Sequence, residues 1–205
     1  VRRQRIHRWA RGYEFTTAKG AHHTSGPVLE RGGRASVESL EFLDLMDIRV
    51  VNAFREVGVG WSTLRAAAIL ARERFGVTHP FSDRRFKTDG KNVFLTLQTR
   101  HNRQALLDLL RDQFVFPKIV EPFLVTVEFE RDTPRRWFPL GKKRHVVVDP
   151  DRSFGQPITR EGSVATYVVA AAVRAEGSVD RVARWFGIPT GAVRDAVEFE
   201  EKPAA

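Results

Sequence analysis

The sequence contains no cysteine and a single methionine among its 205 residues. Without cysteine the chain can form neither disulfide bonds nor thiolate metal sites, which is typical of a protein that works in a reducing cytosol. The longest mostly apolar run, residues 164–173, falls far short of the roughly 20 residues that span a bilayer. No secretory signal is visible either. These absences exclude a disulfide scaffold and indicate a cytoplasmic protein without a membrane segment.

Groups of residues that would indicate catalysis are missing as well. No nucleophile lies near a base, and no glycine-rich phosphate loop is visible. His22 and His23 are adjacent and His7 is near them, but no carboxylate or thiolate lies at ligand spacing, which favours contact with phosphate or solvent over metal. Asp149 and Asp151 lack a third catalytic or ligand group, and Asp149 begins an ordinary turn. We therefore expect no enzyme activity, no metal and no cofactor.

The positive charge is unevenly distributed along the chain. The net charge is +9, but residues 1–35 contain eight Lys and Arg against two acidic residues, and residues 78–145 contain fourteen against eight. Residues 36–77 contain five against six, and residues 146–205 contain seven against nine. A phosphate backbone is bound by clustered positive charge. The first 35 residues, and after them the middle of the chain, are therefore the segments expected to meet DNA.

Residues 1–12 have the pattern of the last part of a helix that ends at Gly12. Ile6 and Trp9 share one face, and arginines surround the rest, which suits a helix in a major groove; a solvated basic helix is the alternative. Because Val1 is not a methionine and the chain opens in mid-helix, we expect an upstream piece of this helix-turn-helix to be missing.

A wing is expected to follow this basic helix. Residues 13–17 and 27–31 can pair as a hairpin around a Gly/His/Ser-rich tip, and such a hairpin commonly lies along a phosphate backbone or minor groove. The residues expected to contact DNA from the helix and the wing are Arg2, Arg3, Gln4, Arg5, Arg8, Arg11, Lys19, His22 and His23.

Two helices are predicted next, over residues 37–57 and 62–75. Apolar residues follow the helical period in both, Gly58 and Gly76 are expected to end them, and Ser62 is expected to cap the second. The residues that follow, 78–149, are expected to form a small sheet with one helix. The predicted elements are a hairpin of residues 84–88 and 92–97 around Asp89-Gly90, a helix over 102–114, an alternating strand over 123–130, a basic link over 131–144 and a strand over 145–149.

The C-terminal part is expected to contain three helices. The first covers residues 164–175, and the other two cover residues 179–186 and 190–199, separated by Gly187-Ile188-Pro189. Ser178 and Thr190 are each placed to cap a helix. This helix-turn-helix pattern fits a nucleic-acid reader or a helical hairpin that packs a small core, and the acidic balance of the segment argues against the reader.

The order of these elements resembles two known arrangements. The basic helix, wing and "DLMDIRVVNAFREVGVGWSTLRAA" resemble the winged helix-turn-helix of MerR-like regulators. With "HPFSDRRFKTDGKNVF", and with "VVDPDRSFGQPITREGSVATYVV" through "AVEFEE", most of the chain is similar to a VapB-type antitoxin family. Phe154 stands where that family usually has glycine, and "REGSVAT" replaces a Gly-Thr-Arg step, so no role of this loop is carried over.

The resemblance implies an α+β, mainly helical fold with three parts: a winged helix-turn-helix over residues 1–77, a mixed middle segment over 78–144, and an antitoxin-like helical domain over 145–205. It implies a homodimer that binds operator DNA and a PIN-domain ribonuclease toxin, whose acidic, metal-binding active site an arginine of the antitoxin can enter. A stand-alone MerR-like regulator or architectural DNA-binding protein is the alternative, followed by an RNA-binding accessory protein. The arginines that can contact the toxin are Arg152, Arg160, Arg174, Arg181, Arg184 and Arg194.

Overall fold

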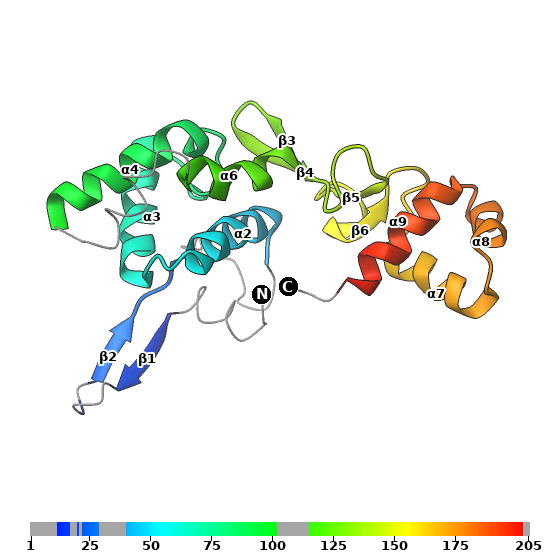
Figure 1. Ribbon diagram of the computed structural model, residues 1–205, viewed down its shortest axis with the longest axis horizontal. Helices are drawn as coiled ribbons and strands as arrows, with labels where there is room; N and C mark the ends of the chain where they lie inside the picture. Colours follow the sequence, from blue (N-terminus) through cyan, green and yellow to red (C-terminus); the bar gives the residue numbers. More distant parts are fainter. Residues whose placement is uncertain (1–11, 17–19, 21, 29–39, 102–114, 203–205) are drawn as a thin grey trace. The chain divides into compact units, whose positions relative to one another are not determined.

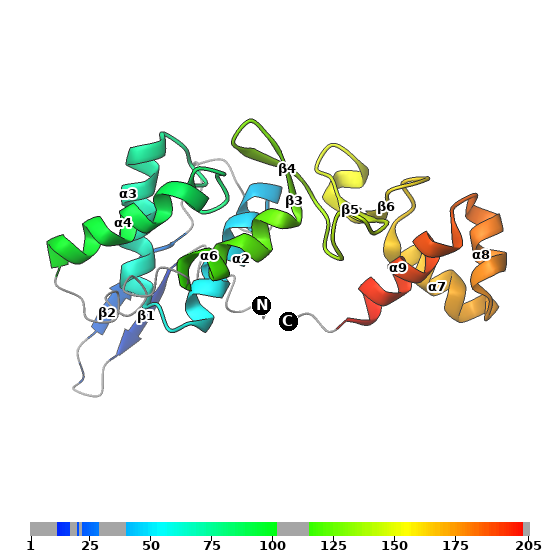
Figure 2. The ribbon, with the colours of Figure 1, turned by 45° about the horizontal axis from the view of Figure 1, so that its top comes forward.

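The computed structural model describes residues 12–16, 20, 22–28, 40–101 and 115–202. The chain divides into two compact units, Val1–Phe123 and Leu124–Ala205, hereafter the N-terminal and C-terminal units. Their elements can be followed in two views (Figures 1 and 2). The fold is mixed, with helices in both units, a two-stranded hairpin in the first and a four-stranded antiparallel sheet in the second. No helix among these described residues is long and apolar enough to cross a membrane.

The predicted wing is a hairpin, but its second strand begins earlier than predicted. Strand β1 (Tyr13–Thr16) pairs in antiparallel register with β2 (His22–Ser25). The predicted pairing of residues 13–17 with 27–31 was therefore wrong, although residues 29–31 themselves lie outside the described residues. Two residues explain the earlier position. Gly20 adopts φ +78°, which allows a tight turn, and Pro27 lacks the N–H that a ladder partner requires.

Both predicted helices that follow are present as α2 (Phe42–Glu56) and α3 (Trp61–Phe75). Helix α2 begins at a capping box in which the Glu41 side chain accepts from the backbone and the Asp44 carboxylate accepts from the Glu41 N–H at 3.0 Å. Helix α3 begins after Gly60, so the prediction of Ser62 as its cap was wrong. The helix predicted over 102–114 lies outside the described residues.

Five phenylalanines form the core of the N-terminal unit. They come from α2, from the segment after α3, from α4 (Phe86–His101) and from α6 (Val115–Val125), and their ring centroids lie 5.1 to 6.4 Å apart where they contact. Each ring is at most 2% exposed, and together they are Phe54, Phe81, Phe86, Phe94 and Phe116.

Helix α4 replaces the predicted hairpin of residues 84–88 and 92–97, which was wrong. Asp89-Gly90 was taken as a turn, whereas Gly90 lies inside the helix and is buried. A Cβ on Gly90 would lie only 2.6 Å from Cζ of Phe116, so a glycine here allows the ring to pack against the helix backbone.

The C-terminal unit opens with a sheet in the order β3-β4-β5-β6, all antiparallel. The strands are β3 (Val127–Glu130), β4 (Thr133–Trp137), β5 (Val146–Val148) and β6 (Pro157–Thr159). The prediction of β5 is confirmed. The strand predicted over 123–130 was too long, because residues up to Val125 are helical, and the predicted link over 131–144 contains β4.

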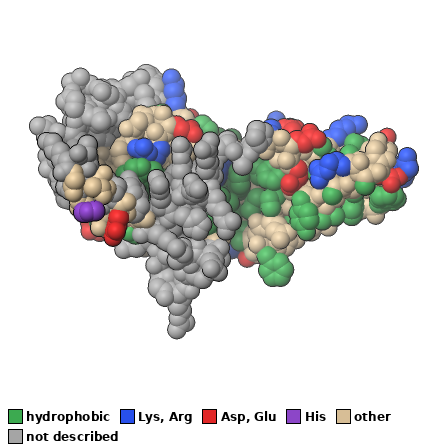
Figure 3. Space-filling model, turned by 90° about the horizontal axis from the view of Figure 1, so that it is seen from below, with side chains coloured by type: hydrophobic (Ala, Val, Ile, Leu, Met, Phe, Trp, Pro, Cys, Tyr) green, Lys and Arg blue, Asp and Glu red, His purple; other side chains and the backbone are tan. Residues whose placement is uncertain are grey.

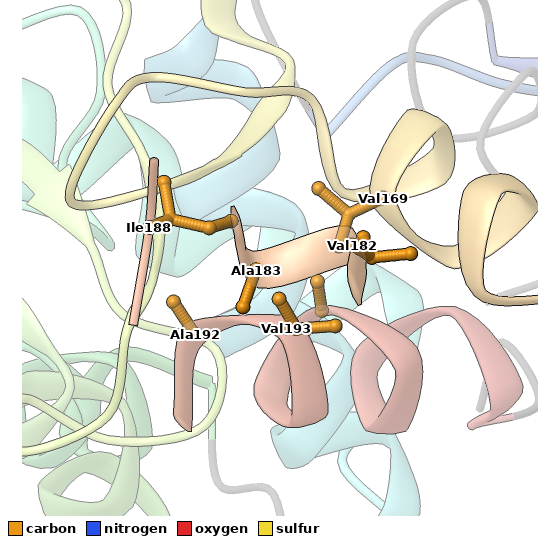
Figure 4. Packing of buried hydrophobic residues seen from close by; sticks show 7 residues of the cluster. Val169, Val182, Ala183, Ile188, Ala192 and Val193 are labelled. Carbon is orange, nitrogen blue, oxygen red and sulfur yellow. The ribbon is translucent and has the colours of Figure 1, made fainter. Parts of the chain in front are cut away.

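Three helices follow, α7 (Thr166–Glu176), α8 (Val179–Phe186) and α9 (Thr190–Glu201), as predicted. The Ser178 Oγ accepts a hydrogen bond from the Arg181 N–H at 3.3 Å, which confirms the predicted cap. The Thr190 cap was wrong, because Pro189 occupies that position and no side chain bonds there. The helices share a buried cluster, of which Figure 4 labels Val169, Val182, Ala183, Ile188, Ala192 and Val193.

Candidate functional site

The hairpin carries the part of the predicted DNA surface that the structure describes. The side chains of Glu14, Thr16, His22 and Thr24 are exposed, and His22 Nδ1 lies 3.2 Å from Thr16 Oγ1 across the two strands. His23 lies in β2 opposite Phe15. The other predicted DNA contacts lie outside the described residues, namely Arg2, Arg3, Gln4, Arg5, Arg8, Arg11 and Lys19.

Two arginines of α3 hold the end of the hairpin. Arg65 donates to the Gly26 carbonyl at 3.3 Å, and Arg72 donates to the Val28 carbonyl at 3.0 Å. Val28 is 3% exposed, so the chain enters the core directly after β2. The base of the hairpin is therefore fixed to α3, while the described side chains of β1 and β2 stay in solvent. This arrangement suits an element that projects from a rigid helical support.

A buried acidic and basic cluster braces the helices behind the hairpin. The Asp47 carboxylate accepts from the Ser82 N–H at 2.7 Å and lies 3.6 Å from His79 Nδ1; the Asp44 carboxylate lies 3.9 Å from the same nitrogen. Burial alone would lower the pKa of His79, but the hydrogen bond to Asp47 and the charges of Asp47, Asp44 and Glu41 outweigh burial and raise it. Among the residues that the structure describes, no three acidic, His or Cys side chains could hold a metal ion.

In the C-terminal unit, two of the predicted partner-contacting arginines bind other parts of the same unit. Arg152 donates to the Ser163 hydroxyl and, at 3.4 Å, to the Arg160 carbonyl. Arg160 donates to the Lys142 carbonyl at 3.4 Å, and its guanidinium lies 5.5 Å from the Phe138 ring centroid. Both side chains therefore help to hold the loops around β6.

The other arginines that were predicted to contact a partner protein lie on the helices. Arg181 donates to the Glu176 carboxylate at 2.5 Å. Arg174 on α7, Arg184 on α8 and Arg194 on α9 are exposed, and among the described residues none of the three makes a hydrogen bond or ion pair. Arg152, Arg160 and Arg181 thus bond within the C-terminal unit, whereas Arg174, Arg184 and Arg194 are exposed and available to another protein.

Arg144 connects the sheet to α9. Its guanidinium lies 2.6 Å from the buried Asp195 carboxylate and also bonds Glu198, and the His145 N–H donates to Asp195 at 2.8 Å. Burial would raise the pKa of Asp195, but the hydrogen bonds from Arg144 and His145 outweigh burial and lower it. The two hydrogen bonds of Glu198, from Lys202 and Arg144, lower its pKa as well. These contacts fix the position of α9 against the sheet.

The loop between β5 and β6 presents an aromatic ring. Asp149 is 2% exposed and accepts from Arg136 Nε at 2.9 Å and from the Asp151 N–H at 3.1 Å, so its role is structural. Phe154, in the short 3₁₀ turn Ser153–Gly155, has φ +55° and a fully exposed side chain, 102% of the reference area. The loop is thus firmly held at its base while its tip carries an unburied ring.

Trp185 is the exposed residue that the sequence reasoning missed. Its side chain is 61% exposed on α8, beside Arg184 and one turn after Arg181. The signal in the pattern was partial, because at about 100° per residue Trp185 falls roughly 80° from the middle of the face that Val182 and Phe186 define, at the edge of that face. Figure 3 shows one side of the C-terminal unit, at the right, where basic and acidic side chains are interspersed with hydrophobic ones.

The predicted resemblance to VapB-type antitoxins is confirmed by a similarity that extends over nearly the whole chain. The relative is "Putative antitoxin VapB45" of Mycobacterium tuberculosis (strain ATCC 25618 / H37Rv), which is 27% identical over 210 residues, covering 97% of this chain and 87% of that protein. The crystal structure of Rv2018 from Mycobacterium tuberculosis matches with a TM-score of 0.69 and 25% identity, covering 96% of this chain and 91% of that one. No family model matches the sequence.

Proposed function

We propose that this protein is an antitoxin that binds and neutralises a PIN-domain ribonuclease toxin, and that it represses its own operon by binding DNA as a homodimer. The observation that carries the proposal is the similarity to an antitoxin over 97% of the chain. The division of charge supports two separate tasks, since residues 1–35 have a net charge of +6 and residues 146–205 a net charge of −2.

DNA binding is assigned to the first 35 residues. Arginine and glutamine in residues 1–12 match the side chains that read base edges and phosphates in a major groove. The hairpin projects from α3 with His22 exposed, which suits a wing on the neighbouring backbone. A homodimer would present two such surfaces to a symmetric operator and so double the contacts of one half-site.

Toxin binding is assigned to the C-terminal unit. Its outer helix surfaces carry exposed arginines, and an arginine can neutralise an acidic active site by pairing with its carboxylates. The resemblance to VapB-type antitoxins implies that the toxin is a PIN-domain ribonuclease with such a site. A helical domain that covers the entrance would also exclude the RNA substrate.

The DNA assignment is tested by a gel-shift titration with the DNA upstream of the operon. Replacing Arg3, Arg5 and Arg8 with Ala should abolish binding and flatten its salt dependence, because about one counterion is released for each phosphate contact. Arg194→Ala is the matched control and should bind DNA as the unchanged protein does. Loss of binding in the Arg194 variant, with binding retained in the triple variant, would reverse the assignment of the two ends.

The toxin assignment is tested with the product of the reading frame that adjoins this one, which we expect to be a PIN-domain protein. The two proteins, produced together, should co-elute from a sizing column as one complex, and the complex should lack the RNA cleavage of the toxin alone. The triple variant at Arg3, Arg5 and Arg8 should still form the complex. Separate elution of two stably folded proteins, with RNA cleavage undiminished, would rule the antitoxin function out.

A further inference from the structure

The outer face of α8 combines an exposed tryptophan with an arginine that has no partner among the described residues. With 3.6 residues per turn, Arg181, Arg184 and Trp185 fall within an arc of roughly 100°. The buried residues Val182 and Ala183 lie on the opposite side of the helix. The face formed by Arg181, Arg184 and Trp185 is called the α8 face below.

Trp185 is unusual for its position. At 61% exposure the indole leaves a large apolar surface in water on an eight-residue helix whose inner face is already well packed. Burying a tryptophan in a partner contributes strongly to binding, and tryptophan and arginine are the residue types most enriched among those that dominate interface energies. The exposed part of the indole contributes no apolar burial to the folded protein.

The arginines decide the charge of the partner. Arg181 already pairs with Glu176 at 2.5 Å, whereas Arg184 is exposed and makes no hydrogen bond or ion pair with the described residues. Arg194 is also exposed without such a partner, but it lies on α9 among Glu198 and other acidic residues, with no exposed aromatic ring beside it. Of Arg174, Arg184 and Arg194, Arg184 is the one that adjoins the exposed Trp185 on the same helix, so it is best placed to meet a carboxylate next to the recess that takes the ring.

Charge also separates a protein partner from nucleic acid and from a second copy. The three helices α7, α8 and α9 contain four arginines against six acidic residues, and this net negative charge opposes a phosphate backbone. A two-fold contact through the α8 face would place Arg181 and Arg184 of one copy against those of the other, which like-charge repulsion disfavours. The α8 face requires only one carboxylate opposite Arg184 beside an apolar recess for the ring, and a protein surface can supply both without being acidic as a whole.

We propose that the α8 face is the docking surface for the toxin, with Trp185 buried in an apolar recess of the toxin and Arg184 paired with a carboxylate at its rim. This inference rests on the proposed antitoxin function. Arg181 lies on the same face, and its guanidinium is already paired with Glu176. The proposal selects Arg184 from the six arginines that the sequence left as equal candidates.

The experiment measures the affinity of the full-length protein for the adjoining PIN-domain protein by calorimetry. Trp185→Ala and Arg184→Glu should each weaken binding at least tenfold, and Arg194→Glu, an equal charge reversal on α9, should change it less than twofold. Because all three side chains are exposed, the variants should melt at the temperature of the unchanged protein. Gel-shift titrations and sizing-column masses of the free variants should stay unchanged.

The outcomes distinguish this inference from the function on which it rests. If the unchanged protein fails to bind the PIN-domain protein, the antitoxin function fails and the inference falls with it. If the unchanged protein binds and the Trp185 and Arg184 variants bind equally well, only the docking surface is overturned. Loss of DNA binding in these variants would assign the α8 face to nucleic acid, and loss of the dimer would assign it to a second copy; either result overturns the proposal.

Discussion

Gly90→Ala is a substitution for which two physical effects of opposite sign compete. Gly90 lies inside α4, where alanine is favoured over glycine by about 1 kcal/mol. Its new Cβ, however, would lie 2.6 Å from Cζ of Phe116 and 3.1 Å from two ring carbons of Phe86, and the first distance is shorter than any that real Cβ atoms show. Whether Gly90→Ala raises or lowers the stability therefore reports whether the Phe116 ring is packed against α4.

The packing of Phe116 decides the expected sign. Its ring is enclosed by Phe54, Phe86 and Phe94 at centroid distances of 5.7, 5.8 and 6.1 Å, so it cannot move away without displacing other rings. Overpacking of this kind typically costs about 1–3 kcal/mol. We expect the cost to exceed the gain in helix propensity and Gly90→Ala to destabilise the N-terminal unit by about 1 kcal/mol.

Hydrogen exchange measured by mass spectrometry along the chain is the suitable assay, because it reports the free energy of opening of each unit separately. Peptides of α4 and α6 should exchange faster in the Gly90→Ala variant, while peptides of α8 should not change. Asn92→Ala, at an exposed position of the same helix, gains helix propensity without a ring contact and should slow exchange slightly. Adding Phe116→Leu to Gly90→Ala should recover part of the loss. Slower exchange in the Gly90→Ala variant would refute the packing of Phe116 described above.

Three further predictions concern other contacts. Phe154→Gly should stabilise the C-terminal unit by about 1 kcal/mol in thermal melts, because a fully exposed ring at φ +55° contributes backbone strain and no burial; a lower melting temperature would contradict this. Because the pKa of His79 is raised in the folded protein, the stabilisation that its protonated ring gives the fold is complete below its unfolded pKa, near 6.5. This stabilisation is lost as the pH rises through the higher folded pKa. Melts over a pH series should therefore show this loss in the unchanged protein and its absence in His79→Gln. Arg144→Ala should cost about 1–3 kcal/mol in denaturant unfolding, because the buried Asp195 carboxylate loses its cation; an unchanged midpoint would show that the contact contributes nothing.

The helices that the sequence predicted are those whose start and stop signals are local. Helix α8 begins at Ser178, whose hydroxyl caps it, and ends before Gly187, whose φ of +62° stops it. Both signals depend on one residue and its immediate neighbours. For the same reason the ends of α2 and α3 fell within a few residues of their predicted places. Ser62, which looked like a cap, is the second residue of α3, because Gly60 occupies the cap position.

The elements that the sequence mispredicted depend on contacts between residues far apart. Asp89-Gly90 is a strong hairpin signal in isolation, yet Gly90 serves the close approach of Phe116, which lies 26 positions later and belongs to another helix. Strand β4 was taken for a basic link because of its Pro and Arg content. Its Arg136 instead pairs with the buried Asp149 across the sheet, a contact that no local pattern reveals.

Two of the exposed aromatic rings of the C-terminal unit, those of Trp185 and Phe154, show the same division. The helical period places Trp185 at the edge of the face that Val182 and Phe186 define, so its exposure was only partly open to prediction. The exposure of Phe154 depends on a turn whose base is held by Asp149 and Arg136, and on a left-handed backbone that a phenylalanine rarely adopts. A ring that is 61% exposed on an ordinary helix buries little surface and strains no backbone, so its removal should cost the fold little. Trp185→Ala is therefore a clean test of binding, whereas a change at Phe154 also alters stability.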